Sequence, residues 1–399
     1  MKILHTADWH LGRKTDDLDR TEEIKEVLNQ VVKIANEENV DMVLIAGDIY
    51  DSLVPSAEAE NLFFNTISEL SNSGNRAVVA IAGNHDDPKR LSNAGVFSSN
   101  FNIYLVGYYD EIKINKDLTD RNIYPIDCGK GYIKFKKKNE EVVVVCLPYP
   151  SFYRYKETKK EGEDLKDKIK DWLSEGVGKF KKSSINILTS HILSYGEDMT
   201  DEEREEYSHE INGLFPFIEK ECLNYGANYV ALGHLHQPIC VSQTNNIYYS
   251  GSLIHTHFSP KNLATKSVNI IDLNSKGIKS FKKVPLNVKN LLQISATSLS
   301  EVKEFCLNHP TDYIKAIITT NIGINYEELK LLRKDCVNLV TISVLNNQMK
   351  FSENFESKKD LTTGEIFDKF VEKRTGKLPD NDVKELFLEL MGENVYEAD

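Results

Sequence analysis

The sequence predicts an α/β protein in which two β-sheets are flanked by helices, followed by a smaller α/β unit and two C-terminal helices. Three observations predict this class. Strand and helix patterns alternate over the first 100 residues, short strands with polar hairpins follow, and a second strand–helix alternation begins after Pro285. With 399 residues the chain exceeds the usual size of one domain, so we expect a large domain with smaller appendages.

The first part of the chain has the rhythm of a β-α-β-α-β unit. Residues 3–7, 42–46 and 77–82 are apolar runs typical of strands covered on both faces. Between them, residues 22–38 and 57–70 carry apolar side chains at helical spacing. Strands joined by such helices run parallel, and ligands collect at the carboxyl ends of parallel strands. Polar residues that directly follow these three strands are therefore candidates for a binding site.

The middle of the chain contains shorter strands. Residues 103–147 show short strands and polar hairpins, and apolar residues at helical spacing around 165–173 predict a covering helix. Two more buried strands, 185–189 and 228–232, each end just before a histidine. Later runs are expected to form a second, more antiparallel sheet, and these are residues 247–249, 267–273 and 278–284.

Beyond residue 285 the chain divides into three segments. Residues 286–345 carry a β-α-β-α-β pattern and predict a small separate α/β unit. Residues 346–360 are polar and aperiodic, which predicts a linker. Residues 361–399 hold two predicted helices, the first opened by the capping-box signature of Thr362 and Glu365. The large first domain is thus expected to span residues 1–285.

Bulk composition limits the function classes. The net charge of −12 argues against a surface that binds nucleic acid everywhere, but it does not exclude a local site that metal ions make positive. No apolar run approaches the roughly 20 residues that span a bilayer, and the N-terminus is unlike a signal peptide. Six cysteines without CxxC spacing are typical of free thiols in a reducing compartment. We therefore expect a cytoplasmic protein without membrane association.

Five short motifs carry side chains that bind divalent metal ions, and each follows a predicted buried strand. Taken singly, a histidine or aspartate at a strand end is usually structural. Together, aspartate, asparagine and histidine side chains in this number predict a dinuclear metal site. The motifs are Asp8-Trp9-His10, Gly47-Asp48, Gly83-Asn84-His85-Asp86, Ser190-His191 and Gly233-His234-Leu235-His236.

A dinuclear site of this kind suits the hydrolysis of phosphate esters. Two metal ions about 3.5–4 Å apart bind the phosphate, activate water and neutralise the charge that develops on the leaving oxygen. A mixture of carboxylate, amide and imidazole ligands favours Mn, Fe or Zn over Mg or Ca. No cysteine lies in the motifs, which argues against a structural zinc site.

The order of these motifs resembles that of the calcineurin-like metallophosphoesterases. The stretches at residues 4–12 and 46–51 narrow the resemblance to the SbcD type of DNA double-strand-break nuclease. Residues 1–285 resemble this family through their motifs. The remaining residues resemble it through the order of their predicted helices and strands. The resemblance implies a four-layer α-β-β-α sandwich for residues 1–285 and a small DNA-binding capping domain at 286–345. It also implies that residues 361–399 bind the coiled coil of a partner ATPase.

The resemblance further implies two divalent metal ions, expected to be Mn²⁺, held by seven residues. Asp48 is expected to bridge the two ions. The remaining ligands are Asp8, His10 and His236 for one ion, and Asn84, His191 and His234 for the other.

Two more residues receive roles from the same resemblance. His85 is expected to contact the phosphate and to protonate the leaving oxygen as general acid. Asp86 is expected to orient His85 or to hold the loop that carries it. Water would be the nucleophile.

For the whole protein, the resemblance implies a nuclease of DNA repair and recombination. It would act as a 3′–5′ exonuclease on double-stranded DNA and as an endonuclease on single strands and hairpins. Its implied partners are DNA and an SbcC-type ATPase, in a heterotetramer with two copies of each chain. Homodimerisation is expected through helices at residues 57–70 and 87–97.

Three positions depart from the family pattern. His255 and His257 form another H-x-H where the family has a Gly-Ser loop. Substrate contact by these two histidines is the less favoured interpretation, and they are not expected to bind metal. Asp51 stands where archaeal and eukaryotic members place a histidine, a choice that bacterial relatives share.

Two other functions remain open from the sequence. One is a phosphodiesterase for small molecules, which would share the five motifs but usually ends soon after the last of them. The other is a binding module that has kept the fold and lost catalysis, in which the ligands are usually eroded. The long C-terminal part argues against the first function, and the complete ligand set argues against the second.

Overall fold

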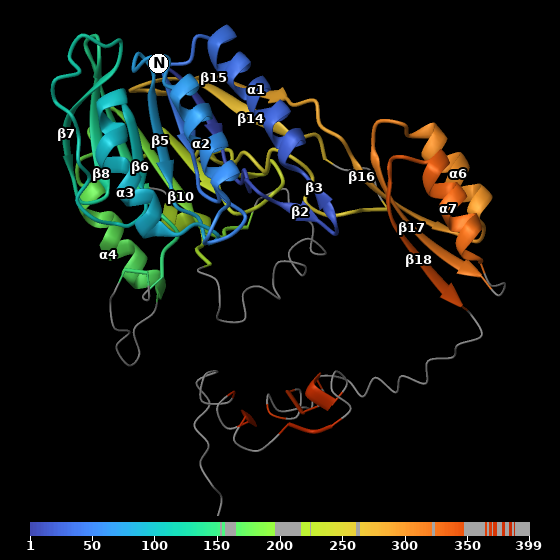
Figure 1. The fold of residues 1–399 in the computed structure, drawn as a ribbon. Helices are drawn as coiled ribbons and strands as arrows, with labels where there is room; N and C mark the ends of the chain where they lie inside the picture. The colour runs from blue at the N-terminus through green and yellow to red at the C-terminus, as the bar shows by residue number, and fades with distance from the viewer. Residues whose placement is uncertain are drawn as a thin grey trace, which may run out of the picture. The chain divides into compact units, whose positions relative to one another are not determined.

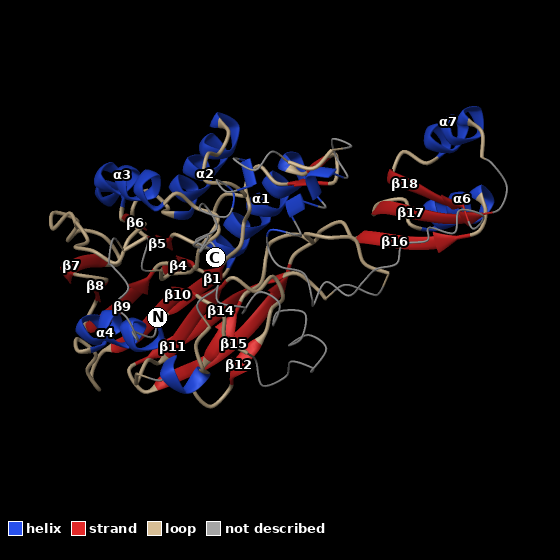
Figure 2. Cartoon of the chain, turned by 90° about the horizontal axis from the view of Figure 1, so that it is seen from below, coloured by secondary structure: helices blue, strands red, loops and turns tan. Residues whose placement is uncertain are grey.

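The computed structural model describes residues 1–151, 154–155, 165–195, 217–223, 225–260, 264–320 and 324–346, with single positions and short runs between 364 and 387. The chain divides into two compact units, Met1–Leu345 and Asn346–Asp399. Figures 1 and 2 show that the main part of the larger unit is built from two sheets, with helices on their outer faces.

The first sheet has six strands and a parallel centre. The strands β1, β4, β5 and β6 run parallel, whereas β14 is antiparallel to β1 and to β15. In order across the sheet they are β15 (Gly277–Pro285), β14 (Ser267–Asn274), β1 (Lys2–Thr6), β4 (Met42–Ile45), β5 (Ala77–Ile81) and β6 (Ile103–Val106).

The second sheet has seven strands. Its centre, from β9 to β13, is parallel, and its edges are antiparallel. In order across the sheet the strands are β12 (Cys240–Ser242), β13 (Ile247–Tyr249), β11 (Tyr229–Gly233), β10 (Ile185–His191), β9 (Glu140–Leu147), β8 (Tyr132–Lys137) and β7 (Tyr124–Gly129).

Alternating side chains produce four layers. In β4, Met42 and Leu44 join the core between the sheets, whereas Val43 and Ile45 pack under the helices of the first sheet. Those helices are α1 (Thr21–Glu37), α2 (Ala57–Leu70) and α3 (Pro88–Ser98). On the far side, α4 (Leu165–Val177) packs Trp172 on the outer face of the second sheet. The predicted α-β-β-α sandwich is confirmed.

The predicted strand membership of the second sheet was wrong in part. Residues 267–273 and 278–284 fall in β14 and β15, which extend the first sheet through pairing of β14 with β1. The second sheet is also more parallel than expected, because β9, β10, β11 and β13 all run the same way. Apolar alternation marks a strand as half-buried, but it does not say which partner the strand pairs with.

A small three-stranded sheet follows, with the predicted β-α-β-α-β order. Its strands are β16 (Leu291–Ala296), β17 (Tyr313–Thr320) and β18 (Leu339–Asn346), and β16 and β17 are parallel. The helices α6 (Leu299–Asn308) and α7 (Tyr326–Asp335) pack on this sheet through Val302 and Leu332. The domain boundary at residue 285 stays a prediction, because this sheet belongs to the same compact unit as the sandwich.

Several predictions for the C-terminal part concern residues that the structure does not describe. The linker was predicted at 346–360; Asn346 ends β18, and residues 347–360 and the capping-box residues Thr362 and Glu365 lie outside the described residues. Among the described positions of this unit, the rings of Phe367 and Phe387 stack with centroids 4.0 Å apart. No helix in the described part of the chain is long and apolar enough to cross a bilayer.

His5 links the two sheets and makes stability depend on pH. From β1 it hydrogen-bonds the Tyr229 hydroxyl at 2.9 Å and the Leu232 carbonyl at 3.1 Å, both in β11 of the other sheet. Burial lowers the pKa of His5 from 6.5 to about 3. Between pH 3 and pH 6.5, His5 is therefore protonated in the unfolded chain and neutral in the folded chain.

We predict that the free energy of unfolding falls as the pH falls from 6.5 toward 3, with His5 contributing up to about 1.4 kcal/mol per pH unit. The variant His5→Gln removes this contribution, so its stability should fall less steeply over the same range. Urea unfolding at several pH values between 7 and 4 measures both slopes. Equal slopes for the two proteins would contradict the assignment.

Candidate metal centre

The five predicted motifs come together at one edge of the sandwich. Three follow parallel strands of the first sheet, where Asp8 comes after β1, Asp48 after β4 and Asn84 after β5. The other two belong to the second sheet, where His191 ends β10 and His234 directly follows β11. The carboxyl ends of parallel strands from both sheets therefore form a single site.

The main chain in these motifs adopts conformations that aim the side chains at one point. Asp8, His10 and Asp48 have φ values of 53°, 46° and 49°, in the left-handed region that non-glycine residues rarely adopt. Such residues cluster at functional sites. Gly47 has a φ of 92°, and a Cβ at this position would lie 2.3 Å from Nδ1 of His191. Glycine is thus required where the two sheets approach.

Asp8, His10 and His236 form the first of two side-chain clusters. One ligand atom from each lies within 4.8 Å of the others. The Nε2 atoms of His10 and His236 are 3.0 Å apart. The carboxylate of Asp48 reaches this cluster with its Oδ2 atom, 3.7 Å from Nε2 of His10.

Asn84, His191 and His234 form the second cluster. Oδ1 of Asn84 lies 3.0 Å from Nε2 of His191 and 3.0 Å from Nδ1 of His234. The other oxygen of Asp48, Oδ1, is 3.5 Å from Nε2 of His191. Asp48 thus presents one oxygen to each cluster. This is the geometry expected of a bridging carboxylate.

The buried carboxylates and imidazoles shift each other's pKa values. Burial raises the pKa of Asp8 well above its ordinary value. Burial also opposes ionisation of Asp48, but His191 and His10 outweigh it and lower the pKa of this carboxyl. Although burial disfavours a charged His191, Asp48 raises the pKa of this imidazole to about 9. Burial lowers the pKa of His234 to about 3, so this ring is neutral and has a lone pair to donate.

The donor set fits divalent metal ions. The two imidazole nitrogens of His10 and His236 face each other at 3.0 Å, an arrangement that needs a proton or a cation between them. Buried carboxylates need cationic partners, yet no lysine or arginine among the described residues forms an ion pair with Asp8 or Asp48. Carboxylate, amide and imidazole donors together suit Mn, Fe or Zn.

His85 lies at the open side of the site. Its side chain is 41% exposed, and its Nε2 atom is 4.0 Å from Oδ2 of Asp48. Its Nδ1 atom lies 3.1 Å from the main-chain oxygen of Asp51, which can only accept, so Nδ1 carries a proton. Nε2 therefore faces the space in front of the two clusters.

Asp86 is buried beneath the loop and does not face the site. Its carboxylate accepts hydrogen bonds from the main-chain amides of three residues, which fastens the loop that carries Asn84 and His85. A direct part of Asp86 in catalysis stays a prediction. The main-chain amides that donate to the Asp86 carboxylate are those of Ile49 at 3.1 Å, Tyr50 at 2.9 Å and Gly83 at 2.8 Å.

A second set of contacts orients the histidines of the first cluster. Oδ1 of Asp51 lies 3.2 Å from Nδ1 of His10, and Arg13 donates to the same carboxylate at 2.9 Å. Arg13 also donates to the main-chain oxygen of Thr256 at 3.3 Å, and the Thr256 hydroxyl lies 3.2 Å from Nδ1 of His236. Nδ1 of His10 thus faces the Asp51 carboxylate and Nδ1 of His236 faces Thr256, and both Nε2 atoms turn toward the cluster.

Two further cations hold main-chain segments of the site, and the sequence did not indicate either one. Arg154 donates to the main-chain oxygens of Gly83 at 2.7 Å and Asn84 at 2.6 Å. Lys266 is buried and donates to the main-chain oxygen of His236 at 2.7 Å. Neither residue lies in a motif, and each binds a carbonyl group, which every residue has. No sequence signal could therefore have singled them out.

Among the described residues, His5, His255 and His257 do not belong to either cluster. His5 is buried between the sheets, as expected for a structural residue. His255 is buried, and its main-chain oxygen accepts from Arg20 at 3.0 Å. The ring of His257 is exposed, and its Nδ1 atom lies 3.3 Å from the Thr256 hydroxyl, the same hydroxyl that contacts Nδ1 of His236. A substrate contact by His255 or His257 remains the less favoured interpretation from the sequence.

Comparisons with known proteins agree with this geometry. Residues 1–238 match the family model of the calcineurin-like phosphoesterases. The SbcD chain of the SbcCD nuclease from Bacillus subtilis (strain 168) is 35% identical in an alignment of 405 positions, which covers 98% of this chain and 97% of that protein. The corresponding chain from Staphylococcus epidermidis (strain ATCC 12228 / FDA PCI 1200) is 25% identical over 357 residues, 89% of this chain and 88% of that protein.

Two solved structures are also similar in part. The protein TT1561 of Thermus thermophilus has a TM-score of 0.38 and 12% identity, covering 71% of this chain and 98% of its own. A dimetal phosphatase from Danio rerio has a TM-score of 0.39 and 14% identity, covering 72% of this chain and 99% of its own.

The sandwich fold and the paired clusters at its edge define a calcineurin-like phosphoesterase, a hydrolase that uses divalent metal ions. Within this class, the match along nearly the whole chain is more specific. The chain belongs to the SbcD family and is a metal-dependent nuclease of the SbcCD type.

We predict that Asp51→Asn weakens metal binding by about 10- to 100-fold, because the variant loses the charge that holds His10 and Arg13. Isothermal titration with Mn²⁺ measures the affinity and the number of ions bound. The exposed Asp17→Asn, which makes the same chemical change, should bind metal like the wild type. Unchanged affinity in Asp51→Asn would contradict the role, and loss of a whole equivalent would make Asp51 a ligand.

Proposed function

We propose that this chain cleaves DNA, as a 3′–5′ exonuclease on double-stranded ends and as an endonuclease on single strands and hairpins. The observation that carries the proposal is the pair of clusters that share Asp48, since two adjacent metal sites suit attack on a phosphodiester. The match to an SbcCD nuclease chain along 98% of this chain favours DNA over a small phosphodiester. The complete donor set argues against a module without catalysis.

The proposed cofactor is a pair of Mn²⁺ ions. When bound, the ions would neutralise charge on the phosphate and lower the pKa of a water molecule. Asp48 would bridge them with its two oxygens. One ion would be held by Asp8, His10 and His236, and the other by Asn84, His191 and His234.

His85 is the proposed general acid. Nδ1 donates a hydrogen bond to the Asp51 carbonyl, which fixes the ring and leaves Nε2 to face the substrate. A proton on Nε2 would be delivered to the leaving oxygen. Its place at the rim of the site, 41% exposed, suits a group that meets the substrate.

We predict that His85→Gln keeps both metal ions and lowers the rate of hairpin cleavage by about 10²- to 10⁴-fold, because it removes the proton donor. Cleavage of a labelled DNA hairpin gives the rate, and elemental analysis gives the metal content. His309→Gln, a matched change in the small α/β unit, should leave both values unchanged. Wild-type cleavage by His85→Gln would exclude the acid role, and loss of metal would make His85 a ligand.

The proposed macromolecular partners are DNA and an SbcC-type coiled-coil ATPase, in a complex with two copies of each chain. The unit at residues 286–345 would act as the DNA-binding cap, and residues 361–399 would bind the coiled coil. Stacked rings of Phe367 and Phe387 support a helical pair in the latter segment. All six cysteines are free, which is consistent with the proposed cytoplasmic location.

We also propose that two copies of the chain pair through α2 and α3. These helices expose Phe64 (40%), Phe97 (76%) and the adjoining Phe101 (62%) around an apolar hollow of about 360 Å³. Three exposed phenylalanines at one hollow are unusual on a monomer surface. The hollow lies on the outer layer of the sandwich, between α2 and α3.

We predict that Phe97→Glu converts the protein to a monomer, because it places a charge in the apolar interface. Analytical ultracentrifugation across a concentration series measures the oligomeric state. Leu307→Glu, an equally exposed apolar position in α6, is the matched control and should leave the wild-type state intact. A wild type that is monomeric at all concentrations would refute the proposed dimer.

A further inference from the structure

The loop of residues 83–86 is held from the second sheet by one arginine. Arg154 lies between β9 and α4, and its two terminal nitrogens donate to the main-chain oxygens of Gly83 at 2.7 Å and Asn84 at 2.6 Å. These oxygens belong to the two peptide groups that flank the Asn84 side chain. A guanidinium group is charged and holds its donors in a rigid plane, so a paired contact of this kind is strong and directional.

The peptide group between Asn84 and His85 is held at both ends. Arg154 binds its oxygen, and its N–H group, which is that of His85, donates to Oδ1 of Asp48 at 2.9 Å. A rotation of this peptide group would break both hydrogen bonds at once. The main chain of Asn84 is therefore fixed relative to the carboxylate that joins the two clusters.

This constraint reaches the second cluster through the Asn84 side chain. An asparagine side chain is short, so the position of its main chain largely decides where its amide oxygen lies. Oδ1 of Asn84 lies 3.0 Å from Nε2 of His191 and 3.0 Å from Nδ1 of His234. Because an amide oxygen has no net charge, its use as a metal ligand depends on how firmly it is held in place.

Arg154 is itself supported by Tyr149. The guanidinium group lies over the Tyr149 ring, 5.2 Å from its centroid. Tyr149 is buried, and its main-chain amide donates at 2.9 Å to the oxygen of Ala82, one residue before the loop. Its ring also meets the ring of His191 edge-on, with centroids 6.3 Å apart. Tyr149 thus packs against both the arginine and a member of the second cluster.

The first cluster has separate supports. Asp51 faces Nδ1 of His10, and Thr256 faces Nδ1 of His236. Within the part of the chain that the structure describes, Arg154 forms no hydrogen bond with a side chain of the first cluster. A change at Arg154 should therefore act on the second cluster and spare the first.

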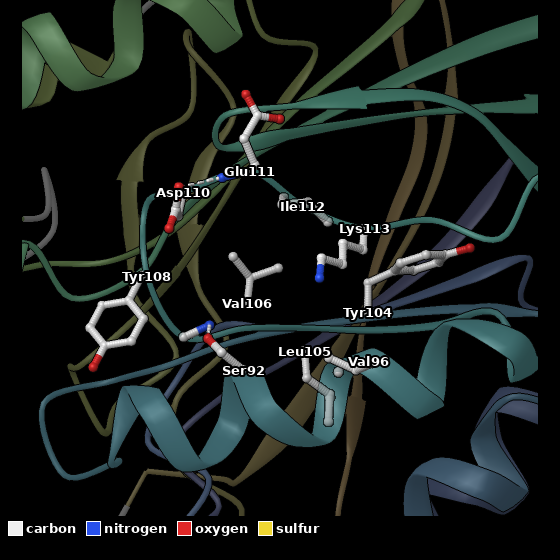
Figure 3. Close-up of a pocket in the computed structure, with 12 residues that line it drawn as sticks. Ser92, Val96, Tyr104, Leu105, Val106, Tyr108, Asp110, Glu111, Ile112 and Lys113 are labelled. Carbon is white, nitrogen blue, oxygen red and sulfur yellow. Dashed lines mark hydrogen bonds between the residues drawn. The ribbon is translucent and has the colours of Figure 1, made fainter.

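A cavity of about 210 Å³ lies beside α3, the helix that follows the loop. Figure 3 shows Ser92, Val106 and Lys113 around it, with the Tyr108 ring set apart at one end. The ammonium group of Lys113 forms no hydrogen bond or ion pair with any residue that the structure describes. We assign no ligand to this cavity. The charge of Arg154, in contrast, is directed onto the loop itself.

We propose that Arg154 is a positioning residue for the metal ion of the second cluster. It holds the main chain of Asn84 so that the amide oxygen of this residue stays beside His191 and His234. This inference rests on the proposed ligand set, and it adds a residue that acts on one ion without binding it. Loss of Arg154 should weaken one of the two ions selectively.

Titration of the full-length protein with Mn²⁺ tests this selectivity. In Arg154→Met, which keeps the aliphatic bulk and loses the donors, we expect the affinity for one ion to fall about 10- to 100-fold and the affinity for the other to stay unchanged. Arg154→Lys keeps the charge but loses the paired donors, so its loss of affinity should be smaller. Arg333→Met, an exposed position in α7, is the matched control and should bind both ions like the wild type.

The shared carboxylate of Asp48 allows the weakened ion to be identified. Two Mn²⁺ ions that share a carboxylate give a spin-coupled electron paramagnetic resonance spectrum, whereas a single ion gives the hyperfine lines of isolated Mn²⁺. At a Mn²⁺ concentration that just fills both sites of the wild type, Arg154→Met should show the isolated-ion spectrum. Crystals of this variant should keep the anomalous peak beside Oδ2 of Asp48 and lose most of the peak beside Oδ1.

The possible results separate the role of Arg154 from the existence of the metal centre. Unchanged affinity in Arg154→Met, equal weakening of both ions, or loss of the peak beside Oδ2 of Asp48 would overturn the positioning role. A wild type that binds fewer than two ions would refute the proposed dinuclear centre, and this inference with it.

Discussion

The site depends on the position of one carboxylate, that of Asp48. Its two oxygens lie 3.7 Å from His10 and 3.5 Å from His191, so it joins the two clusters, each of which takes side chains from both sheets. It reaches this point only because its own φ is 49° and Gly47 before it leaves room for His191. The amide of His85 donates to the same carboxylate at 2.9 Å, which places the proposed acid relative to both clusters.

The layers of the fold serve this arrangement. Parallel strands at the centre of each sheet send their carboxyl ends to one edge, and each end delivers a ligand. The buried His5 holds β1 against β11 across the core, so that Asp8 and His234 stay in register. Indeed, the amide of His234 donates to Asp8 at 3.0 Å. The sandwich and the site are thus parts of one set of contacts.

Much of this could be predicted from the sequence, for physical reasons. Continuous apolar runs followed by glycine and a polar ligand, as at Gly47-Asp48, mark the ends of buried parallel strands. They marked the strand ends and the five motifs, whereas the four layers and the seven proposed ligands were implied by the resemblance to the calcineurin-like metallophosphoesterases. Local patterns could not predict pairing between distant segments, which is why β14 and β15 were placed in the wrong sheet.

The supporting residues were harder to predict than the ligands. Arg154 and Lys266 act on main-chain oxygens, and Arg13 acts through Asp51 and Thr256, so each needs the folded structure to be recognised. Asp51 was noticed only as a departure from a family pattern. Its contact with His10 shows that it stands within reach of the first cluster.

The central claim is that two metal ions share Asp48, and anomalous diffraction at the manganese edge tests it most directly. Crystals of the full chain soaked in Mn²⁺ should show two peaks about 3.5–4 Å apart, one beside each oxygen of Asp48. A single peak, or two peaks that do not share Asp48, would contradict the account.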